Sequence, residues 1–427
     1  MNSFLKIISF AVCLLIISSA VSCGGEKKQE ENQKTSQKVY NTAFQQATTA
    51  VPNSTTGETE TTSVAETETE ITLPRTQKRT GKRGSFKQTE DMRKISSKQM
   101  LTEMGAGITL GDSFSANGLG GDKSIEEYET YFENPIVTKE LIKAYADCGF
   151  SAVRIPVSWT DHIDEKGVVD ELWLDRIEEV VNYVLDNGMY CIINSQNDQS
   201  WLTTNDSDFN NTKSRFSKMW TSIANRFKDY NDHLLFEGVS EILKADNDKS
   251  DPSETDIKNA NSINQAFVNA VRATGKNNAK RHLIISTYGS FVSSAALDGF
   301  KLPNDTVKNK LIAKVNVYVP SSFCLDQSQK QVWGSQEDKA YLDNVFAVIN
   351  WRFSELGIPC IIGEFGAVDK GNASARAAFA KYVVSTAYNY YMVCFWNDNG
   401  GDMKLLDRNN SKIINQKIVD CIIDSAG

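Results

Sequence analysis

The sequence lacks the features that mark several large classes of protein. It carries 46 lysine and arginine residues against 54 aspartate and glutamate residues, a formal net charge of −8. A chain of that balance offers no dense basic face for nucleic acid. After residue 22 no apolar run is long enough to cross a bilayer. No GxGxxG or phosphate-loop signature follows the first expected strand, which argues against a nucleotide site.

The eight cysteines show no close CxxC pair, and several lie within apolar runs such as YCII and PCII. This pattern favours small buried core residues over a zinc site or a disulfide framework. Without a cluster of ligand residues we expect neither a metal nor a cofactor. Six cysteines follow the N-terminal region, namely Cys148, Cys191, Cys324, Cys360, Cys394 and Cys421.

The first 22 residues are typical of an export signal. Lys6 supplies a positive charge, and the apolar stretch from Ile7 to Val21 is too short and wrongly flanked for a stable membrane span. Small residues directly before Cys23 resemble the cleavage site of a bacterial lipoprotein. Cys23 would then carry the lipid and tether an extracellular protein to a bacterial membrane, its only membrane contact. Ordinary secretion and an uncleaved anchor are the alternatives.

Residues 23–98 differ from the rest of the chain in composition. They are rich in threonine, glutamate and serine, contain runs such as TTGETETTSVAETETE, and have almost no aromatic residues. Such a segment cannot bury enough apolar surface to offset the entropy lost on ordering. We therefore expect a disordered linker between the signal and a folded domain.

A regular alternation of apolar runs and helix-period segments fills residues 99–427. In the segment SRFSKMWTSIANRFKDY, for example, the apolar residues recur at the spacing of one helix face. Continuous apolar strands that alternate with helices indicate a parallel sheet covered on both faces, and eight such units predict an α/β fold, the (β/α)8 or TIM barrel. The expected strands are Gly107–Leu110, Ala152–Val157, Tyr190–Asn194, Leu234–Val239, Leu283–Ser286, Lys314–Tyr318, Cys360–Gly363 and Met392–Phe395.

Polar residues follow these strands, at the end of a barrel where active sites form. Two of them, Glu241 and Glu364, come from nearly opposite strands and can face each other across the barrel mouth. Retaining cleavage of a glycoside needs such a pair, one carboxyl as acid/base and the other as nucleophile. The other candidates for this rim are Asp112, Arg154, Gln196, Asn197, Trp201, Ser240, Asn316, Tyr318 and Trp396.

Several long segments in this order, including GFSAVRIPVSW, GIPCIIGEFGA and CFWNDNG, resemble glycoside hydrolase family 5. The resemblance covers about residue 99 to 426 and is strongest to bacterial cellulases with broad β-glucan and xyloglucan activity. It implies that Glu364 is the nucleophile and Glu241 the acid/base. It further implies that Arg154 supports the nucleophile, that Tyr318 lies beside it, and that Trp396 forms the platform under the sugar.

The chain departs from the family pattern near both glutamates. Ser240 stands where the family usually has the asparagine that binds the substrate 2-hydroxyl, and serine is shorter. Asp112 replaces an asparagine and would add a like charge beside the nucleophile, raising a carboxyl pKa. Asn397 stands where a second tryptophan often follows Trp396.

The histidines that the family keeps near the cleavage point are also replaced. Gln196-Asn197 occupies the place of a His-His pair, and Asn316 that of the histidine before the strand-six tyrosine. Amides still donate and accept hydrogen bonds, but they do not titrate near neutral pH.

Three hypotheses follow. The first is a monomeric enzyme that hydrolyses β-1,4-linked glycans with retention, acting on cellulose, mixed-linkage glucan or xyloglucan. The second is a catalytically impaired barrel that binds carbohydrate at the cell surface. The third treats both glutamates as salt-bridge partners of Arg154 with no role in chemistry. In the first two the partner is a polysaccharide or oligosaccharide.

Overall fold

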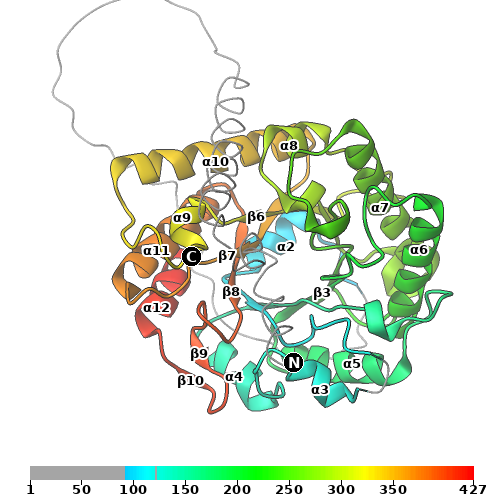
Figure 1. Ribbon diagram of the computed structural model, residues 1–427, viewed down its shortest axis with the longest axis horizontal. Coiled ribbons are helices and arrows are strands. Elements are labelled where there is room, and N and C mark those ends of the chain that lie inside the picture. The colour runs from blue at the N-terminus through cyan, green and yellow to red at the C-terminus, as the bar shows by residue number, and fades with distance from the viewer. Residues whose placement is uncertain (1–91, 121–122) are drawn as a thin grey trace, which may run out of the picture.

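The computed structural model describes residues 92–120 and 123–427 of the chain (Figure 1). The expected signal peptide, Cys23 and most of the expected linker lie outside these described residues. Within them the chain forms a closed barrel of eight parallel strands in the order β1 to β8, surrounded by helices. The predicted (β/α)8 barrel is confirmed.

The strands lie close to the predicted runs, with shifted ends. The sixth strand begins at Leu311, whereas the sequence predicted a start at Lys314. Lys310 and Lys314 interrupt the apolar pattern of the sequence, but the backbone pairing with the fifth strand continues from Leu311 to Lys314. The barrel strands are β1 (Gly107–Leu110), β2 (Ala152–Ile155), β3 (Tyr190–Asn194), β4 (Leu234–Glu237), β5 (Leu283–Ser286), β6 (Leu311–Val317), β7 (Cys360–Phe365) and β8 (Val393–Asp398). The short strands β9 (Leu406–Asp407) and β10 (Lys412–Ile413) form a separate hairpin.

The helices cover the outside of the barrel, and many begin at a side-chain cap that the sequence supplies. Ser335, for example, caps α10 and forms a capping box with Asp338, which satisfies free N–H groups of the first turn. The helices are α2 (Ser97–Glu103), α3 (Ile125–Glu129), α4 (Lys139–Asp147), α5 (Glu171–Asp186), α6 (Phe209–Arg226), α7 (Glu254–Ala273), α8 (Ser294–Gly299), α9 (Ser321–Cys324), α10 (Gln336–Glu355), α11 (Ala373–Asn389) and α12 (Gln416–Ser425).

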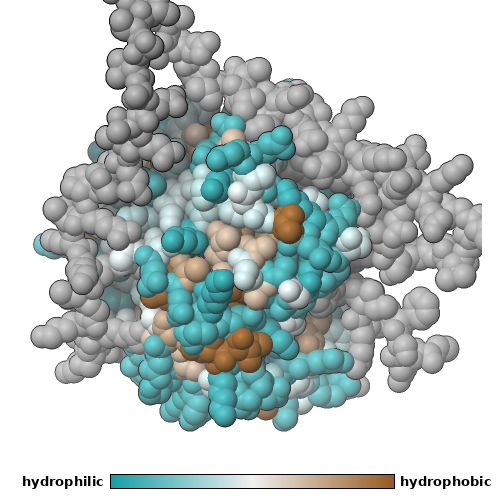
Figure 2. Space-filling model, turned by 90° about the vertical axis from the view of Figure 1, so that its left-hand side faces the viewer, coloured by the Kyte–Doolittle hydropathy of each residue, from teal (hydrophilic) through white to brown (hydrophobic). Residues whose placement is uncertain are grey.

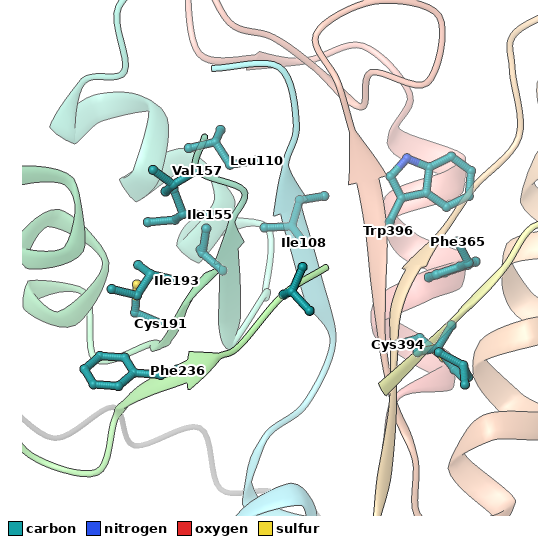
Figure 3. Packing of buried hydrophobic residues seen from close by; sticks show 14 of the residues in the cluster. Ile108, Leu110, Ile155, Val157, Cys191, Ile193, Phe236, Phe365, Cys394 and Trp396 are labelled. Carbon is teal, nitrogen blue, oxygen red and sulfur yellow. The ribbon is translucent and has the colours of Figure 1, made fainter. Parts of the chain in front are cut away.

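Alternate residues of each strand face the helices and the barrel interior, as strand geometry requires. The outward side chains join one large apolar core between sheet and helices. In Figure 3, Phe365, Cys394 and Trp396 point to the same side, toward the helix ribbons that flank β7 and β8. Inward positions are different, because near the mouth they carry charges such as Arg154 and Glu237.

Helix α2 closes the barrel at the amino ends of the strands. Its Met100 and Leu101 are buried against inward residues of the strands, in a second apolar cluster that also includes Ile95. The chain before α2 is fixed too, since Arg93 bonds to Asp232 at 2.7 Å and to Tyr190 at 3.0 Å. Among the described residues, the chain is therefore joined to the barrel from Arg93 onward, which includes part of the segment predicted as linker.

Figure 2 shows one side of the molecule as mostly hydrophilic, with apolar side chains in small groups among polar ones. Exposed large apolar side chains include Leu172 and Val332. Among residues 92–120 and 123–427, no helix is long and apolar enough to cross a membrane. The same residues contain no group of three or more histidine, cysteine, aspartate or glutamate side chains that could hold a metal ion.

We expect Met100→Ala to destabilise the barrel by about 2–5 kcal/mol, because it opens a cavity in the closed floor. Met100 has no exposed surface. Urea unfolding followed by tryptophan fluorescence measures the change. Lys98→Ala on the exposed face of the same helix is the control and should cost less than about 1 kcal/mol. Equal losses in the two variants would contradict the role of Met100.

Candidate active site

Arg154 connects two carboxylates at the centre of the barrel mouth. It comes from an inward position of β2 and has no exposed surface. Its Nε and Nη2 donate to the two oxygens of Glu237 at 2.6 and 2.7 Å, and its Nη1 donates to Glu364 Oε1 at 2.8 Å. The two-point bond to Glu237 fixes the plane of the guanidinium and therefore aims Nη1 at Glu364. Arg154 thus bonds to Glu364, the predicted nucleophile, and its side chain has no surface open to a substrate.

Glu364, on β7, is held at both of its oxygens. Besides the bond from Arg154, its Oε2 accepts a hydrogen bond from the hydroxyl of Tyr318 at 3.2 Å. That hydroxyl accepts in turn from Asn397 Nδ2 at 3.0 Å. Glu364 is 5% exposed and Glu241 is 8% exposed, so both lie just beneath the surface of the mouth. A carboxylate that is fixed at both oxygens suits a nucleophile.

Glu241 lies in the loop after β4, and the side chain of Asn316 donates a hydrogen bond to it. Asn316 Nδ2 donates to Oε1 at 3.0 Å, while Oε2 is buried without a hydrogen-bond partner. Burial raises the pKa of Glu241, and the negative charge of Glu364 adds to the rise, against the lowering effect of Lys249. A carboxyl that keeps its proton to higher pH suits a general acid.

The register of the sheet brings the two glutamates together. Asn316 of β6, the residue that bonds to Glu241, pairs directly with Glu364 of β7. Adjacent strands lie about 4.8 Å apart, so Glu241 reaches the immediate neighbourhood of Glu364 through this one amide. The two side chains are therefore near enough for the negative charge of Glu364 to raise the pKa of Glu241.

A layer of charge beneath the glutamates was not predicted from the sequence. Glu237 and Lys314 face inward from β4 and β6, and both have no exposed surface. Burial raises the pKa of Glu237, but Arg154 and Lys314 outweigh it and leave the pKa at about 2. A charged residue inside an apolar strand, as in LLFEG and LIAKV, is the signal that could have identified them.

Ser240, predicted to bind substrate, has no exposed surface in the structure. Its side chain is fully buried, and its hydroxyl accepts hydrogen bonds from Arg154 Nη2 at 2.9 Å and from Lys314 Nζ at 3.2 Å. A side chain this short remains below the carboxylates when both cations bind it. Ser240 therefore belongs to the supporting layer.

The prediction that Trp396 forms the sugar platform is also wrong. Its ring is fully buried, packs edge-on against Phe365 and donates from Nε1 to the Met403 carbonyl at 2.9 Å. Figure 3 shows it directed toward the helices. Adjacent strand residues face opposite sides, so the inward position belongs to Asn397, which bonds to Tyr318.

The loop after β3 carries three of the other predicted residues. Gln196 and Asn197 are partly buried, and one side-chain oxygen of each lacks a partner. Asn197 adopts a positive φ of 60° and donates to the Ser115 carbonyl at 3.1 Å. Trp201 packs partly into the core, with the Arg215 guanidinium 4.6 Å from its ring centre. The two amides remain candidates for hydrogen bonds to a ligand, while the Trp201 ring is occupied by protein contacts.

Asp112 follows β1 and adopts a positive φ of 57°. Burial raises the pKa of Asp112 to about 7, with Glu364 contributing to the rise and Arg408 opposing it. Asp112 is thus close enough to Glu364 for the charge of one carboxyl to affect the pKa of the other. Arg408 is itself fixed by bonds to the Gly111 carbonyl and the Ser113 hydroxyl, both at 3.0 Å.

The parallel barrel carries one glutamate in the loop after β4 and another near the end of β7, with an arginine bonded to the second, and these are the residue types that glycoside cleavage uses. Residues 115–402 match the family model of cellulase, glycosyl hydrolase family 5. The chain belongs to this family.

Relatives agree with that assignment. The chain is 37% identical over 350 residues to the cellulase/esterase CelE of Acetivibrio thermocellus, which covers 79% of this chain and 41% of CelE. It is 34% identical over 310 residues to endoglucanase A of Clostridium longisporum, covering 71% and 59% of the two chains. The chain thus spans about two fifths to three fifths of these relatives.

Solved structures resemble this barrel closely. One is a broad specificity endoglucanase from Ruminococcus champanellensis with bound cellotriose, with a TM-score of 0.75 and 35% sequence identity. The match covers 78% of this chain and 100% of that chain.

We expect Asp112→Asn to stabilise the protein above pH 7 and to have little effect near pH 4. The carboxyl ionises at about pH 7 when folded, so wild-type stability is lost as pH rises from the ordinary pKa of aspartate toward 7. An amide removes this loss, a gain of about 4 kcal/mol at pH 8 for a pKa shifted from 3.8 to about 7. Denaturant unfolding at pH 5 and pH 8 measures the difference. The same gain at both pH values would contradict the titration of Asp112.

Proposed function

We propose that this chain hydrolyses internal β-1,4 bonds of glucans and related glycans, with retention of configuration at the anomeric carbon. One observation carries the proposal: Glu241 and Glu364 meet at the barrel mouth in different environments. Both oxygens of Glu364 accept hydrogen bonds, from Arg154 and Tyr318, whereas one oxygen of Glu241 has no hydrogen-bond partner. Two carboxyl groups with unequal surroundings can divide the acid and nucleophile roles.

The first step forms a bond between a Glu364 oxygen and the anomeric carbon. The bond from that carbon to the leaving oxygen breaks, and Glu241 gives its proton to this oxygen. In the second step Glu241, now ionised, takes a proton from water as the water attacks the anomeric carbon and releases Glu364. Because Arg154 and Tyr318 bind both oxygens of Glu364, they orient it for attack and then stabilise it as it leaves.

The substrate class rests on the relatives. The Ruminococcus champanellensis endoglucanase binds cellotriose, a β-1,4-linked glucan fragment. We propose cellulose, mixed-linkage glucan and xyloglucan as the candidate substrates of this chain. We further propose that the chain acts on them as a monomer. The amides of Gln196, Asn197 and Asn316 each have an oxygen without a hydrogen-bond partner, and neutral amides suit sugar hydroxyls.

The second candidate, a carbohydrate-binding barrel without turnover, is favoured by one observation. Ser240 is sealed beneath the carboxylates, so that position offers nothing to the substrate 2-hydroxyl. The interaction that it would normally strengthen in the transition state is then missing. The fixed geometry of Glu364 and the free oxygen of Glu241 support the enzyme more strongly.

We also propose that the protein is exported and tethered to the cell surface by a lipid on Cys23. The support is the sequence of the first 23 residues, in which a charged start and an apolar core end in small residues before cysteine.

Substitution of the two glutamates should give different losses. We expect Glu364→Gln to reduce turnover of β-glucan and of aryl cellobiosides by at least about 1,000-fold, because no substrate can bypass the nucleophile. Glu241→Gln should cost as much on β-glucan but less on a dinitrophenyl cellobioside, whose leaving group needs no proton. Release of reducing ends and of dinitrophenolate measures both, and NMR of the first product reports the anomer.

Three results would contradict the proposal. The first is wild-type protein that releases no more product than Glu364→Gln from β-glucan, xyloglucan or aryl cellobioside. If calorimetry then showed oligosaccharide binding, the carbohydrate-binding candidate would replace it. The second is an inverted first product. The third is equal loss by Glu241→Gln on both kinds of substrate, which would remove the acid role of Glu241.

We expect Cys23→Ser to move the protein from the membrane fraction to the medium, because serine cannot carry the thioether-linked lipid. Immunoblots of fractionated cells, with intact-mass analysis of the membrane form, measure this. A membrane fraction unchanged by the substitution would indicate an uncleaved anchor, and soluble wild-type protein would indicate ordinary secretion. Either result would contradict the tether.

A further inference from the structure

Lys314 is a buried cation that the proposed mechanism does not use. It faces inward from β6, has no exposed surface, and lies in the layer beneath the two glutamates. Ordinary hydrophobic packing does not explain it, since burying an ammonium group is costly unless it is well bonded. Its bonding shows what it is fixed to.

The ammonium group is directed at the residue before Glu241. Its Nζ lies 3.0 Å from the Ser240 carbonyl oxygen, 3.2 Å from the Ser240 hydroxyl and 2.9 Å from the Ser290 hydroxyl. A lysine has three donors, and these three acceptors use all of them. The nearest carboxylate oxygen, on Glu237, is farther away at 3.6 Å. Lys314 is therefore bonded to neutral groups, with its charge held beside the acidic ones.

The Ser240 carbonyl belongs to the peptide group that begins Glu241. A bond that fixes this carbonyl fixes the backbone from which the Glu241 side chain extends. The Ser240 hydroxyl also accepts a bond from Arg154 Nη2 at 2.9 Å. Through Ser240, the support of Glu241 is thus linked to the support of Glu364.

The residue before Glu364 makes room for this arrangement. A Cβ atom on Gly363 would lie 2.3 Å from Lys314 Cε, far closer than atoms pack. Any side chain at this position of β7 would displace the lysine stem. Because Gly363 has no side chain, the stem of Lys314 can pass beside this strand and place its cation beneath Glu364.

We propose that Lys314 is a positioning residue for the acid/base, which holds the Ser240–Glu241 peptide group in place and balances the carboxylates above it. The inference rests on the proposed hydrolase function. The charged groups that face Lys314 are Arg154 from β2, Glu237 from β4, Glu241 from the following loop and Glu364 from β7. The positive charge of Lys314 lowers the pKa of Glu241, against the raising effect of burial.

The experiment compares pH profiles of Lys314→Met with wild type. Methionine keeps the length of the side chain but removes the charge and the three bonds. We expect kcat to fall about 10- to 100-fold with KM within about 2-fold, because Lys314 does not touch substrate. We define the alkaline limb as the decline of kcat/KM on the high-pH side of its profile. We expect this limb to move to higher pH by about 0.5–1 unit, because loss of a nearby positive charge raises the pKa of Glu241.

Lys310→Met is the matched control. Lys310 directly precedes the same strand, is also buried, and donates to the Ile95 carbonyl at 2.7 Å on the floor of the barrel. The Lys310→Met substitution should lower the midpoint of unfolding without moving the alkaline limb of kcat/KM. Lys314→Gln, which removes the charge but retains an amide donor, is the second variant and should move the limb as Lys314→Met does.

The outcomes separate this inference from the proposed function. Wild-type protein without turnover would contradict the function itself. Active wild type with an unmoved limb in folded Lys314→Met or Lys314→Gln would overturn the positioning role alone. If neither Lys314 variant folds while Lys310→Met does, Lys314 is structural and the positioning role is likewise overturned. A lower kcat with the expected shift supports it.

Discussion

The geometry of the barrel mouth depends on the bonds of one guanidinium group. Arg154 is bound at two points by Glu237, and this leaves Nη1 directed at Glu364. A buried arginine with one carboxylate on each side is stable only when all three are present, because removal of any one leaves an uncompensated charge. The site and the interior of the barrel therefore cannot vary independently. Lys314 and Ser240 extend the same bonded layer to the residue before Glu241.

This layer explains how the chain can lack the histidines of its family and keep a defined pair of glutamates. Asn316 takes a hydrogen-bonding place beside Glu241, and Asn397 takes one beside Tyr318. Amides are neutral at every pH, so they do not change the protonation of the glutamates by gaining a charge. The pKa values of the glutamates are set instead by nearby buried cations and by burial itself. Asp112 adds a group near Glu364 that titrates close to neutral pH.

Much of the fold could be predicted from the sequence, because strands buried on both faces are apolar throughout and alternate with amphipathic helices. The two glutamates could be found because strand ends define the rim. Glu237 and Lys314 were missed, since an inward charge in a strand interior is no signal until its partner on another strand is known. The predicted positions of Trp396 and Ser240 differ from the structure for a related reason. Trp396 and Asn397 are one residue apart and face opposite sides, and Ser240 is drawn inward by cations from β2 and β6.

The ion pair between Arg93 and Asp232 fixes the start of the described chain at one end of the barrel. Together with α2 it brings the N-terminal part of the described chain in beneath the floor of the barrel, while Glu241 and Glu364 open at the opposite end. The described chain thus starts at the pole remote from the two glutamates. A ligand at the open end would therefore be separated from that starting point by the full length of the barrel.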